Sequence, residues 1–526
     1  MDTPNYTSGT KFNDPKKYGG IVMRGVHSIV DDIRRGVFKE VAKLAYEGGD
    51  MSRVDLIPYQ MIPGDVAQHR YDVHLERAVI KARVRLALGM NIDRGGHLST
   101  HIDEAVTDQK YFEAPLINVI RSACNACPPK EIRISDNCQG CISHPCMNVC
   151  PVGAIYLDKY KHCHIDQEKC IKCGKCAAQC PYRAISKLER PCAVACGMDA
   201  IESDEHGRAK INYDKCVSCG QCLVNCPFGA IADKSQIFQL ITAMQRSEEV
   251  IACVAPAFVG QFGKDATPSK IKAAMRVLGF TDVVEVSIGA DLCTIQEAHD
   301  FLEEVPEKIP FMGTSCCPAW SVMAKKTFPQ FAECISMALT PMVITARMVK
   351  RDHPNARICF IGPCSAKKLE ANRRTVRSDV DFVLTFEELQ GMFDAKDIDF
   401  TTIVPGPDDV MEEGSGMARG FAVGGGVAAA VVEAVKHIDP DREMLIEYGD
   451  GLKECRRMLT MAKAGKRNGY LLEGMACPGG CVAGAGTIQP VKQSAMAVEN
   501  FKKAATELST TTSPHLNRLD EVAERG

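Results

Sequence analysis

The sequence lacks the features that would place the protein in a membrane or on a nucleic acid. Its longest apolar runs, such as residues 424–432, are far shorter than the roughly 20 residues of a membrane-spanning helix. The net charge is only −3 and no long block of like charge occurs, so no electrostatic attraction to nucleic acid or to a membrane surface is indicated. The polar residues 1–14 contain no apolar signal-peptide core. We therefore expect a cytoplasmic protein with neither a nucleic-acid nor a membrane partner.

Residues 1–122 also lack a recognisable chemical motif. They contain no glycine-rich phosphate loop and no paired metal-ligand residues. Residues 22–48 and 75–89 have charged side chains interleaved with apolar ones in the pattern of helices. We expect residues 1–122 to form a mainly helical region. Its role is not indicated by the sequence, and packing, oligomerisation and partner docking are the three alternatives. Packing is the simplest of the three.

Cysteine, by contrast, is abundant. The chain contains 27 cysteines, most of them between Cys124 and Cys226. A disulfide scaffold would suit a short exported chain, whereas this chain has 526 residues and repeats its cysteines at metal-ligand spacings. Residues 123–235 also repeat a Pro-x-x-Ala-Ile phrase, which indicates internal duplication. These features predict an α+β, ferredoxin-like module that carries several 4Fe-4S clusters.

Ferredoxin-type clusters take three thiolates from a C-x2-C-x2-C run and the fourth from a cysteine that precedes a proline in a neighbouring run. Two runs match this spacing fully, a third has four residues in its middle gap, and a fourth is truncated to Cys192 and Cys196. The complete runs are Cys170, Cys173, Cys176 and Cys180, and Cys216, Cys219, Cys222 and Cys226; the variant run is Cys138, Cys141, Cys146 and Cys150.

Crossing the fourth ligand between neighbouring runs sorts these cysteines into groups of four. The first group is Cys138, Cys141, Cys146 and Cys180; the second is Cys150, Cys170, Cys173 and Cys176; the third is Cys196, Cys216, Cys219 and Cys222. The isolated pair Cys124 and Cys127 completes a fourth group with Cys192 and Cys226. We predict three or four accessory clusters, with Cys163 as a bystander thiol. Zinc ribbons also use C-x2-C pairs, but they require neither the x3-Cys-Pro ending nor the repeated phrase.

From residue 236 to residue 526, apolar strand-like segments alternate with helical ones, which predicts an α/β domain with mainly parallel sheets. The expected strands are 250–254, 283–287, 309–313, 358–361, 382–384 and 470–472, and the expected helices are 269–278, 427–437 and 494–508. Ligands of open α/β sheets gather at the carboxyl ends of strands, and Cys317, Cys364 and Cys477 each follow an expected strand. Three strands therefore aim cysteines at one place.

These cysteines belong to three short motifs. The motifs are Thr314-Ser-Cys-Cys-Pro-Ala-Trp320, Gly362-Pro-Cys-Ser-Ala-Lys-Lys-Leu-Glu370 and Glu473-Gly-Met-Ala-Cys-Pro-Gly-Gly-Cys-Val-Ala-Gly-Ala-Gly486. In this order they resemble the H-cluster signatures of the FeFe (iron-only) hydrogenase family, and the resemblance covers residues 236–487. It implies a catalytic domain with two lobes of mainly parallel sheet and flanking helices. It also implies an H-cluster, which is a 4Fe-4S cubane linked to a diiron subsite with carbonyl, cyanide and a bridging dithiolate amine.

Carried over position by position, the resemblance assigns a role to each site residue. Cys317, Cys364, Cys477 and Cys481 become the cubane ligands, and Cys481 also bridges to the diiron unit. Cys316 becomes the proton-transfer thiol, Lys367 the hydrogen-bond donor to cyanide and Met475 an apolar lid. Pro256, Ala257 and Pro363 fall in the cofactor-binding loops, and Glu297, Asp300 and Ser336 fall on an outward proton relay.

Plainer interpretations exist for several of these positions. Met475 and Trp320 could be core residues, and Lys367 and Lys368 could be a solvated pair. The five other cysteines of this half are interpreted as ordinary buried thiols; they are Cys253, Cys293, Cys334, Cys359 and Cys455.

Three positions depart from the best-known family members. Gly362 stands where those members have methionine, Ala257 where they have serine, and Met342 where they have glutamine, so two hydrogen-bonding side chains are missing. Together with the absence of a plant-type 2Fe-2S cysteine pattern, these changes resemble the group B branch of the family, here with a polyferredoxin-like module upstream.

We expect an anaerobic oxidoreductase that interconverts H2 with protons and electrons, exchanges electrons with a ferredoxin or a similar carrier, and depends on hydrogenase maturation machinery. One alternative is a non-enzymatic iron-sulfur assembly scaffold without the diiron site, against which the Cys316-Cys317 pair and Lys367 argue. The other alternative is an H2 sensor, which would need an added domain where this sequence has a helical tail after Thr487.

Overall fold

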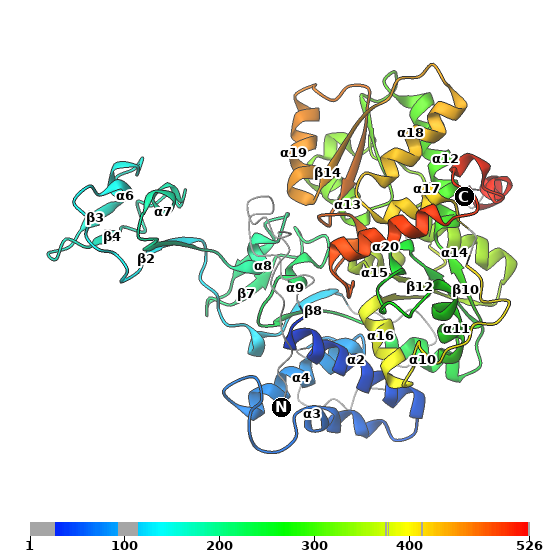
Figure 1. Ribbon diagram of the computed structural model, residues 1–526, viewed down its shortest axis with the longest axis horizontal. Coiled ribbons are helices and arrows are strands. Elements are labelled where there is room, and N and C mark those ends of the chain that lie inside the picture. The colour runs from blue at the N-terminus through cyan, green and yellow to red at the C-terminus, as the bar shows by residue number, and fades with distance from the viewer. Residues whose placement is uncertain (1–26, 93–113, 374–375, 377, 412–413, 524–526) are drawn as a thin grey trace.

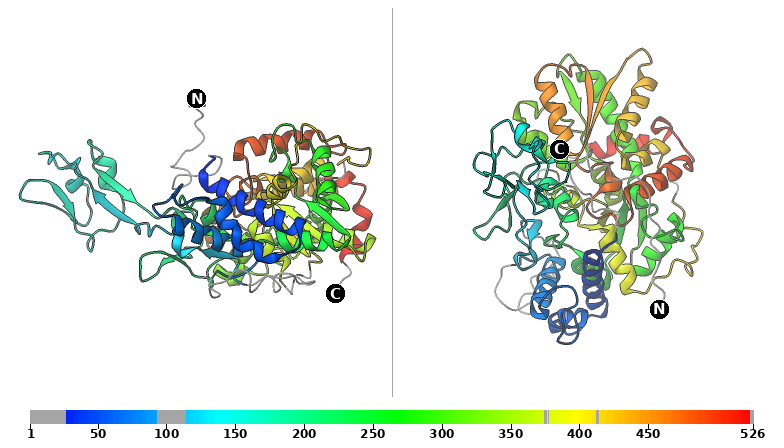
Figure 2. Two further views of the ribbon diagram at one scale, coloured as in Figure 1. Left: turned by 90° about the horizontal axis from the view of Figure 1, so that it is seen from below. Right: turned by 60° about the vertical axis from the view of Figure 1, so that its left-hand side comes forward.

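The computed structural model describes residues 27–92, 114–373, 376, 378–411 and 414–523. Figure 1 shows a large body with a small lobe that projects from one side. The same projection is visible from below in Figure 2. The body contains two sheet lobes with their helices, and the N-terminal helices lie along its lower edge (Figure 1).

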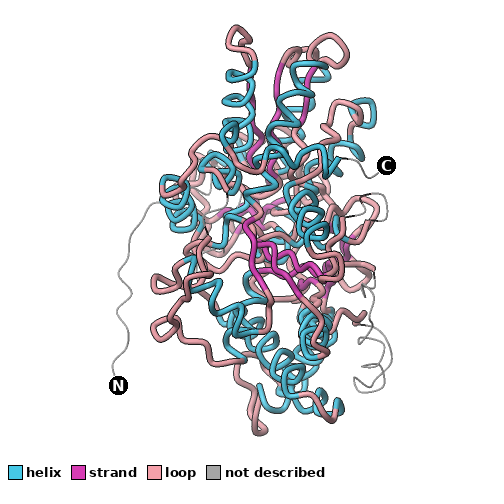
Figure 3. The backbone as a smooth tube through the Cα atoms, turned by 90° about the vertical axis from the view of Figure 1, so that its right-hand side faces the viewer, coloured by secondary structure: helices cyan, strands magenta, loops and turns pink. Residues whose placement is uncertain are grey.

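Two parallel sheets form the framework of the body. The larger sheet has the strand order β10-β9-β12-β13 and the smaller has the order β11-β15-β14. Every ladder in both sheets is parallel, and Figure 3 shows the strands as two groups with helices around both. The strands are β9 (Val250–Val254), β10 (Asp282–Glu285), β11 (Phe311–Gly313), β12 (Arg357–Gly362), β13 (Phe382–Thr385), β14 (Leu445–Asp450) and β15 (Tyr470–Met475).

Helices cover these sheets, as parallel strands that are buried on both faces require. They are α10 (Ile237–Gln245), α11 (Pro268–Leu278), α12 (Ser287–Glu304), α13 (Pro318–Thr327), α14 (Pro341–Asp352), α15 (Ser365–Ala371), α16 (Phe386–Ala395), α17 (Gly416–Arg419), α18 (Gly426–Ile438), α19 (Leu452–Lys463), α20 (Val491–Lys503) and α21 (Leu519–Ala523). The prediction of an α/β domain with mainly parallel sheets is confirmed.

The N-terminal helices pack onto the larger lobe. They are α2 (Ile29–Glu47), α3 (Ile57–Met61) and α4 (Val73–Ala87). Helix α2 packs against α16 and α10, and its buried Val37, Phe38 and Val41 share one hydrophobic core with the residues of β9. Helix α2 therefore packs against the larger sheet lobe, as the simplest of the three alternatives predicts. The predicted helical residues 22–26 lie outside the described residues.

The cluster module consists of antiparallel strand pairs and one-turn helices. Its strands are β1 (Ile117–Val119), β2 (Glu131–Ile134), β3 (Ile155–Leu157), β4 (Cys163–Ile165), β5 (Ile185–Leu188), β6 (Ile201–Ser203), β7 (Ala209–Ile211) and β8 (Ile231–Asp233), paired as β1-β8, β2-β5, β3-β4 and β6-β7. Its helices are α6 (Pro145–Asn148), α7 (Lys175–Gln179), α8 (Pro191–Val194) and α9 (Gln221–Val224). Strand β1 precedes residue 123, yet it pairs with β8, so it packs as part of the module.

Several predicted element bounds need correction. The strand expected at 283–287 ends at Glu285, because α12 begins at Ser287. The helix expected at 494–508 runs instead from Val491 to Lys503. Strand β14 escaped prediction because it lies at an edge of its sheet and is largely exposed, so its sequence lacks a continuous apolar run. In the described ranges, none of the helices combines the length and apolar character that crossing a bilayer needs.

Candidate metal centre

Four cysteines from three separate loops line one cavity between the two sheets. Cys317, Cys364, Cys477 and Cys481 all lie on its wall, together with Cys316. The cavity contains about 870 Å³ that protein atoms do not fill, part of it open to solvent. Most of the remaining wall is made of alanine, proline and other apolar side chains. The thiols are therefore the groups that can bind a metal there.

The loops meet because each follows the carboxyl end of a parallel strand. Strand β11 ends before Cys317, β12 ends before Cys364 and β15 ends before Cys477. Carboxyl ends of parallel strands face the same edge of a sheet, where ligands of such folds gather. Cys317 is also the N-cap of α13, so the positive end of that helix faces the loop that carries the thiol.

The loop that carries Cys481 approaches the loop that carries Cys364 very closely. A Cβ atom at Gly484 would lie 2.3 Å from the carbonyl oxygen of Pro363, so the two backbones can pass only with glycine there. The amide of Gly486 donates a hydrogen bond to the same carbonyl at 2.9 Å. The second and third motifs are therefore joined backbone to backbone.

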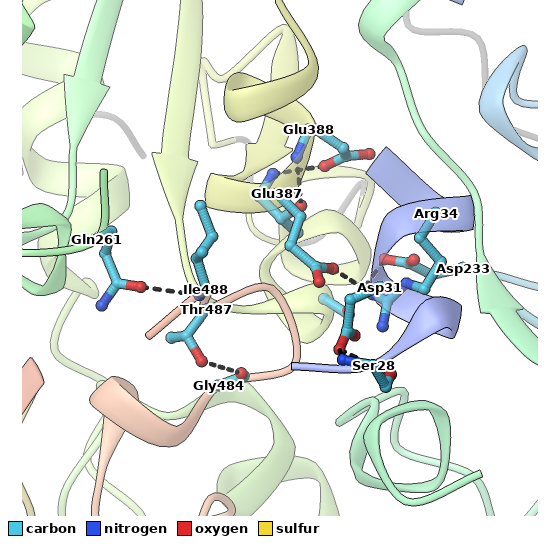
Figure 4. Close-up of polar contacts among 12 residues, drawn as sticks. Ser28, Asp31, Arg34, Asp233, Gln261, Glu387, Glu388, Gly484, Thr487 and Ile488 are labelled. Atoms are coloured by element: carbon cyan, nitrogen blue, oxygen red, sulfur yellow. Dashed lines mark hydrogen bonds and ion pairs between the residues drawn. The ribbon is translucent and has the colours of Figure 1, made fainter. Parts of the chain in front are cut away.

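The chain beyond the third motif is anchored on the larger lobe. The hydroxyl of Thr487 donates to the carbonyl of Gly484 at 3.0 Å, and the amide of Ile488 donates to Oε1 of Gln261 at 2.8 Å (Figure 4). Gln261 is fully buried and its Nε2 donates to Ser494 at 2.9 Å. These contacts fix the position of the loop that carries the last two thiols.

The environment of the four thiols fits a large metal cluster. Burial raises the pKa of Cys364 to about 11, and it also raises the pKa values of Cys317, Cys477 and Cys481 above the ordinary thiol value. Metal ligation needs thiolates, so a bound cluster would displace their protons. Among the described residues, no three His, Cys, Asp or Glu side chains lie close enough together to hold a single metal ion. Four thiols spread around an apolar cavity suit a 4Fe-4S cubane.

Lys367 is the only lysine, arginine, aspartate or glutamate on the wall of this cavity, and every residue of that wall lies in the described part of the chain. Its Nζ lies 2.7 Å from Oε2 of Glu370 and donates to Oγ1 of Thr340 at 3.2 Å. Burial alone would lower the pKa of Lys367, but the carboxylate of Glu370 outweighs it and the pKa is raised. Lys367 is therefore a fixed cation that can donate to an anionic ligand. The interpretation of Lys367 and Lys368 as a solvated pair is wrong, because both side chains are buried.

The side chains expected beside the cubane lie on the same wall. Burial, and after it the nearby Glu297 carboxylate, raises the pKa of Cys316 well above the ordinary thiol value, so Cys316 is a neutral thiol at pH 7. Met475 is only 3 % exposed and faces the cavity. The remaining expected wall residues are also in place; they are Pro256, Ala257 and Pro363.

Helix α12 leads from this wall toward the surface. Ala290 lines the cavity, Glu297 is fully buried, and Asp300 is partly exposed. Spacings of seven and ten residues place all three on one face of a helix. The amide of Ser315 donates to Oε1 of Glu297 at 2.7 Å. Burial raises the pKa of Glu297 to about 7, and the hydroxyl of Ser336 lies close enough to lower it in turn.

Two accessory groups of cysteines each line one small cavity in the cluster module. One cavity is lined by Cys150, Cys170, Cys173 and Cys176. The other is lined by Cys124, Cys127, Cys192 and Cys226, which brings the isolated upstream pair beside the truncated run. The first cavity is lined by the second predicted group, and the other is lined by the fourth group, which the upstream pair completes.

The third group adjoins the main cavity. The third group is Cys196, Cys216, Cys219 and Cys222. Cys196 and Cys216 lie close enough to Cys219 and Cys222 to raise the pKa values of those two thiols after burial, and Cys219 also lines the cavity of Cys364. In the first group Cys138, Cys146 and Cys180 share a small core with Cys163, whose Sγ lies 3.6 Å from that of Cys146. Cys163 is therefore buried beside a candidate ligand.

The repeated Ala-Ile phrase has a structural explanation. The amides of Ala154, Ala200 and Ala230 each donate to the Sγ of the cysteine four residues earlier, at 3.3 Å. All three alanines are buried. Amide hydrogen bonds to cysteine sulfur stabilise thiolate ligands and adjust cluster potentials. The phrase thus supplies a hydrogen bond to a candidate ligand in the second, third and fourth groups.

The departures from the best-known pattern change the shape of the wall. A Cβ atom at Gly362 would lie 2.6 Å from the ring of Phe360 and 3.1 Å from Cβ of Ala255. Phe360 and Met342 both line the cavity. An aromatic ring on the wall therefore occupies space beside Gly362 that a longer side chain at that position would need.

Two residues near the site were not predicted to take part. Glu473 stands at the start of the third motif, is fully buried, and accepts from the amides of Gly425 and Ala428 at 2.9 and 2.7 Å. Burial raises the pKa of Glu473 to about 7. Lys368 is 1 % exposed and pairs with Asp233. For Glu473, a charged residue inside an otherwise apolar motif was the available signal.

Comparisons with known proteins agree with the cysteine pattern. Residues 248–485 match the family model of the iron-only hydrogenase large subunit, C-terminal domain. Residues 248–485 therefore carry a domain of the iron-only hydrogenase family. Residues 164–186 match a 4Fe-4S binding domain, and residues 186–237 match the LdpA Fe-S cluster-binding domain. Iron hydrogenase 1 of Clostridium pasteurianum is 29% identical over 337 residues, which are 55% of this chain and 58% of that protein.

Other relatives of this chain have different names. The periplasmic Fe hydrogenase large subunit of Nitratidesulfovibrio vulgaris is 31% identical over 43% of this chain and 63% of its own length. A probable cytosolic Fe-S cluster assembly factor of Aedes aegypti is 27% identical over 43% of this chain and 58% of its own length. The chain thus spans about three fifths of these relatives. An apo FeFe hydrogenase from Chlamydomonas reinhardtii aligns with a TM-score of 0.45 at 20% identity, over 52% of this chain and 89% of that one.

Proposed function

We propose that this chain is an FeFe hydrogenase that interconverts H2 with two protons and two electrons at an H-cluster. The observation that carries the proposal is one apolar cavity whose wall brings together four thiols, the further thiol of Cys316 and the ammonium of Lys367. When bound, an H-cluster supplies an open iron site that polarises H2 and a cubane that passes electrons. The residues of the chain bind it, shield it from water and move the proton.

The chain offers a proton path that leaves from Cys316. Its neutral thiol exchanges a proton with the carboxylate of Glu297, which burial poises at a pKa of about 7. Ser336 lies next to that carboxylate and Asp300 lies farther along α12, where the helix becomes partly exposed. A group whose pKa lies near the working pH is well suited to pass a proton in either direction.

The chain also offers an electron path of three or four accessory 4Fe-4S clusters. Its inner end is the third cysteine group, because Cys219 lies on the wall of the H-cluster cavity. The fourth group lies next to the third, since Cys192 acts on the pKa of Cys222. We infer that a ferredoxin-type carrier exchanges electrons with the outer groups. Neither path fixes the preferred direction of turnover.

The altered pocket supports placing the chain in the group B branch. We further propose that the protein is cytoplasmic, works anaerobically and receives its diiron unit from hydrogenase maturation machinery. All 27 cysteines, none of which lies outside the described residues, are free of disulfide bonds, which suits a reducing compartment.

A second candidate function is iron-sulfur cluster assembly without H2 chemistry. Relatives named as cytosolic Fe-S cluster assembly factors support it, at 24% to 32% identity. Cys316 and Lys367 favour the hydrogenase, because a cubane held by four cysteines needs neither a fifth thiol nor a buried ammonium on its cavity wall. An H2 sensor would use the same cavity, and turnover rates would separate it from the enzyme.

Infrared spectroscopy combined with an H2 assay tests the proposal. Protein matured under anaerobic conditions should show carbonyl and cyanide bands and should oxidise H2 with a dye as acceptor. Cys316→Ala should retain the bands and lose turnover. The matched control is Cys359→Ala, the same change at a buried thiol of β12 outside the cavity wall. Absence of the bands from fully matured protein would leave the assembly function as the better account.

A further inference from the structure

The projecting lobe is the part of the chain best placed to meet another protein. It comprises residues 131–188, contains the first two cysteine groups, and is joined to the rest of the module along the paired strands β2 and β5. Figures 1 and 2 show it standing clear of the body in perpendicular views. A partner can therefore reach these two groups without contacting either sheet lobe.

One cluster site in this lobe opens to solvent. All 27 cysteines lie in the described part of the chain, and of these only Cys173 is exposed. Cys173 lines the cavity of the second group, next to Val152, Ile171 and Lys175. Val152 is 41% exposed and Ile171 is 59% exposed, although both are apolar. We call Val152, Ile171, Lys172, Cys173 and Lys175 the Cys173 face.

The lobe and the rest of the chain carry charges of opposite sign. Residues 131–188 contain eight Lys and Arg against five Asp and Glu, a net charge of +3, whereas the whole chain has −3. The remainder therefore carries −6. Lys169 pairs with Asp166 inside the lobe, and Lys187 pairs with Glu189, the residue that follows the end of the lobe. Lys172 and Lys175 form no ion pair with any described residue, so their charges are available to a partner.

We propose that the Cys173 face is the docking surface for a small acidic iron-sulfur carrier protein of the ferredoxin type. This inference deepens the proposed function. It rests on that function because it requires a 4Fe-4S cluster at the second cysteine group. Exposed apolar side chains form the contact around the cluster opening, and the two lysines steer the acidic partner. The negative remainder of the chain repels the same partner and so leaves the lobe as the preferred approach.

The transfer itself makes and breaks no covalent bond. One electron would leave a reduced 4Fe-4S cluster of the carrier and would reduce the oxidised cluster that Cys150, Cys170, Cys173 and Cys176 would hold. During H2 oxidation the electron moves in the opposite direction. Cys173 is the exposed residue of that ligand set, so the shortest path between the two proteins would pass through it.

Stopped-flow spectroscopy tests this docking without requiring H2 turnover. A purified bacterial ferredoxin with two 4Fe-4S clusters and an acidic composition, reduced and freed of reductant, is mixed with the oxidised, cluster-loaded full-length protein. The double variant Lys172→Glu/Lys175→Glu should slow the second-order rate about tenfold or more at low ionic strength. It should also remove most of the salt dependence, because the rate of the unmodified protein should fall as salt screens the attraction.

The control is Lys436→Glu/Lys463→Glu, which changes the net charge equally at exposed positions of α18 and α19. This pair should leave the rate within about twofold. Iron content and the electron paramagnetic resonance of the reduced clusters must match in all three proteins, so that a lost cluster is not mistaken for lost docking. An unchanged rate in the first variant, or equal slowing in both, overturns the proposal. Protein that takes up electrons at the Cys173 face but shows no H2 activity would contradict the hydrogenase function and leave the docking surface standing.

Discussion

The ammonium of Lys368 lies 3.1 Å from Oδ2 of Asp233, and these two buried residues belong to different parts of the molecule. Lys368 follows Cys364 on α15, and Asp233 ends β8 of the cluster module. Lys368 also pairs with Glu388 at 2.8 Å and donates to the carbonyl of Lys234 at 2.7 Å. Beside it, Arg34 of α2 pairs with Glu387 of α16 (Figure 4). A buried set of charges thus joins all three regions next to the candidate metal centre.

Lys368→Met should destabilise the protein by about 3–5 kcal/mol, because it leaves Asp233 and Glu388 buried without their cation. The free energy of unfolding of the cluster-loaded protein in denaturant measures the loss. Lys308→Met is the matched control, since Lys308 pairs with Glu303 at an exposed site and its loss should cost far less stability. Electron transfer from the accessory clusters should also slow, while exchange of H2 with deuterated water is retained. Equal stability losses in the two variants would show that Lys368 is not a joint between the regions.

Glu297→Gln should lower H2 oxidation by about 100-fold or more while the infrared bands stay unchanged, because it removes the carboxylate that accepts the proton. The amide can still accept the hydrogen bond from Ser315, so the loop should keep its position. Glu303→Gln makes the same change at an exposed position of α12 and should leave the rate intact. A Glu297→Gln protein with normal turnover would remove this residue from the relay.

The rate of H2 oxidation should rise with pH and level off above about pH 7. Burial raises the pKa of Glu297 to about 7, so only above that pH is the side chain a carboxylate that accepts a proton.

The contribution of Glu297 to the free energy of unfolding changes with pH in the opposite direction to the rate. Its pKa is higher in the folded state than the roughly 4.3 of an unfolded glutamate, so stability falls as pH rises from about 4 to about 7. Initial rates across this range check the first expectation, and unfolding of Glu297→Gln, which should lose that decline, checks the second.

Gly362→Met should destabilise the protein by about 1–3 kcal/mol, although methionine is the residue that the best-known family members have there. A side chain at position 362 collides with the ring of Phe360, and overpacking of a filled core has that cost. The second change Phe360→Ala in the same chain should recover part of the loss by vacating the space. If the single variant is as stable as the unmodified protein, the ring moves freely and does not shape the wall.

Cys192→Ser should reduce the iron content by one 4Fe-4S cluster, because Cys192 lines the cavity of the fourth group together with Cys124, Cys127 and Cys226. Iron analysis and electron paramagnetic resonance count the clusters. Cys163→Ser should leave the count unchanged, although Cys163 lies 3.6 Å from a candidate ligand of the first group. Loss of a cluster from Cys163→Ser instead would make Cys163 a ligand and would require a new assignment of that group.

The sequence predicted the parts of this molecule that are governed by local pattern. Buried parallel strands are continuous apolar runs, and so β9 was placed at its observed bounds, Val250–Val254. Cysteine spacing likewise sorted the candidate ligands into groups, and two of these groups each line one cavity in the structure. Strand β14 could not be found this way, since its exposed edge position allows a mixed sequence.

Features that depend on contacts between distant segments were beyond the sequence. Lys367 and Lys368 are adjacent and chemically identical, yet one faces the metal cavity and the other joins Asp233 of another region. The sequence shows that Glu473 belongs to the third motif. Only the structure shows that Glu473 is buried and that it accepts hydrogen bonds from amides at the start of α18. Packing of α2 against α16 was equally hidden, because amphipathic helices do not specify their partners.

Helix α12 supplies both a wall of the metal cavity and the proposed route for protons, at Ala290, Glu297 and Asp300. Because each residue advances an α-helix by about 100°, inserting or deleting one residue between Ala290 and Glu297 would turn every later position away from its target. Evolution of this protein can therefore exchange side chains along α12 far more readily than it can change the length of this helix.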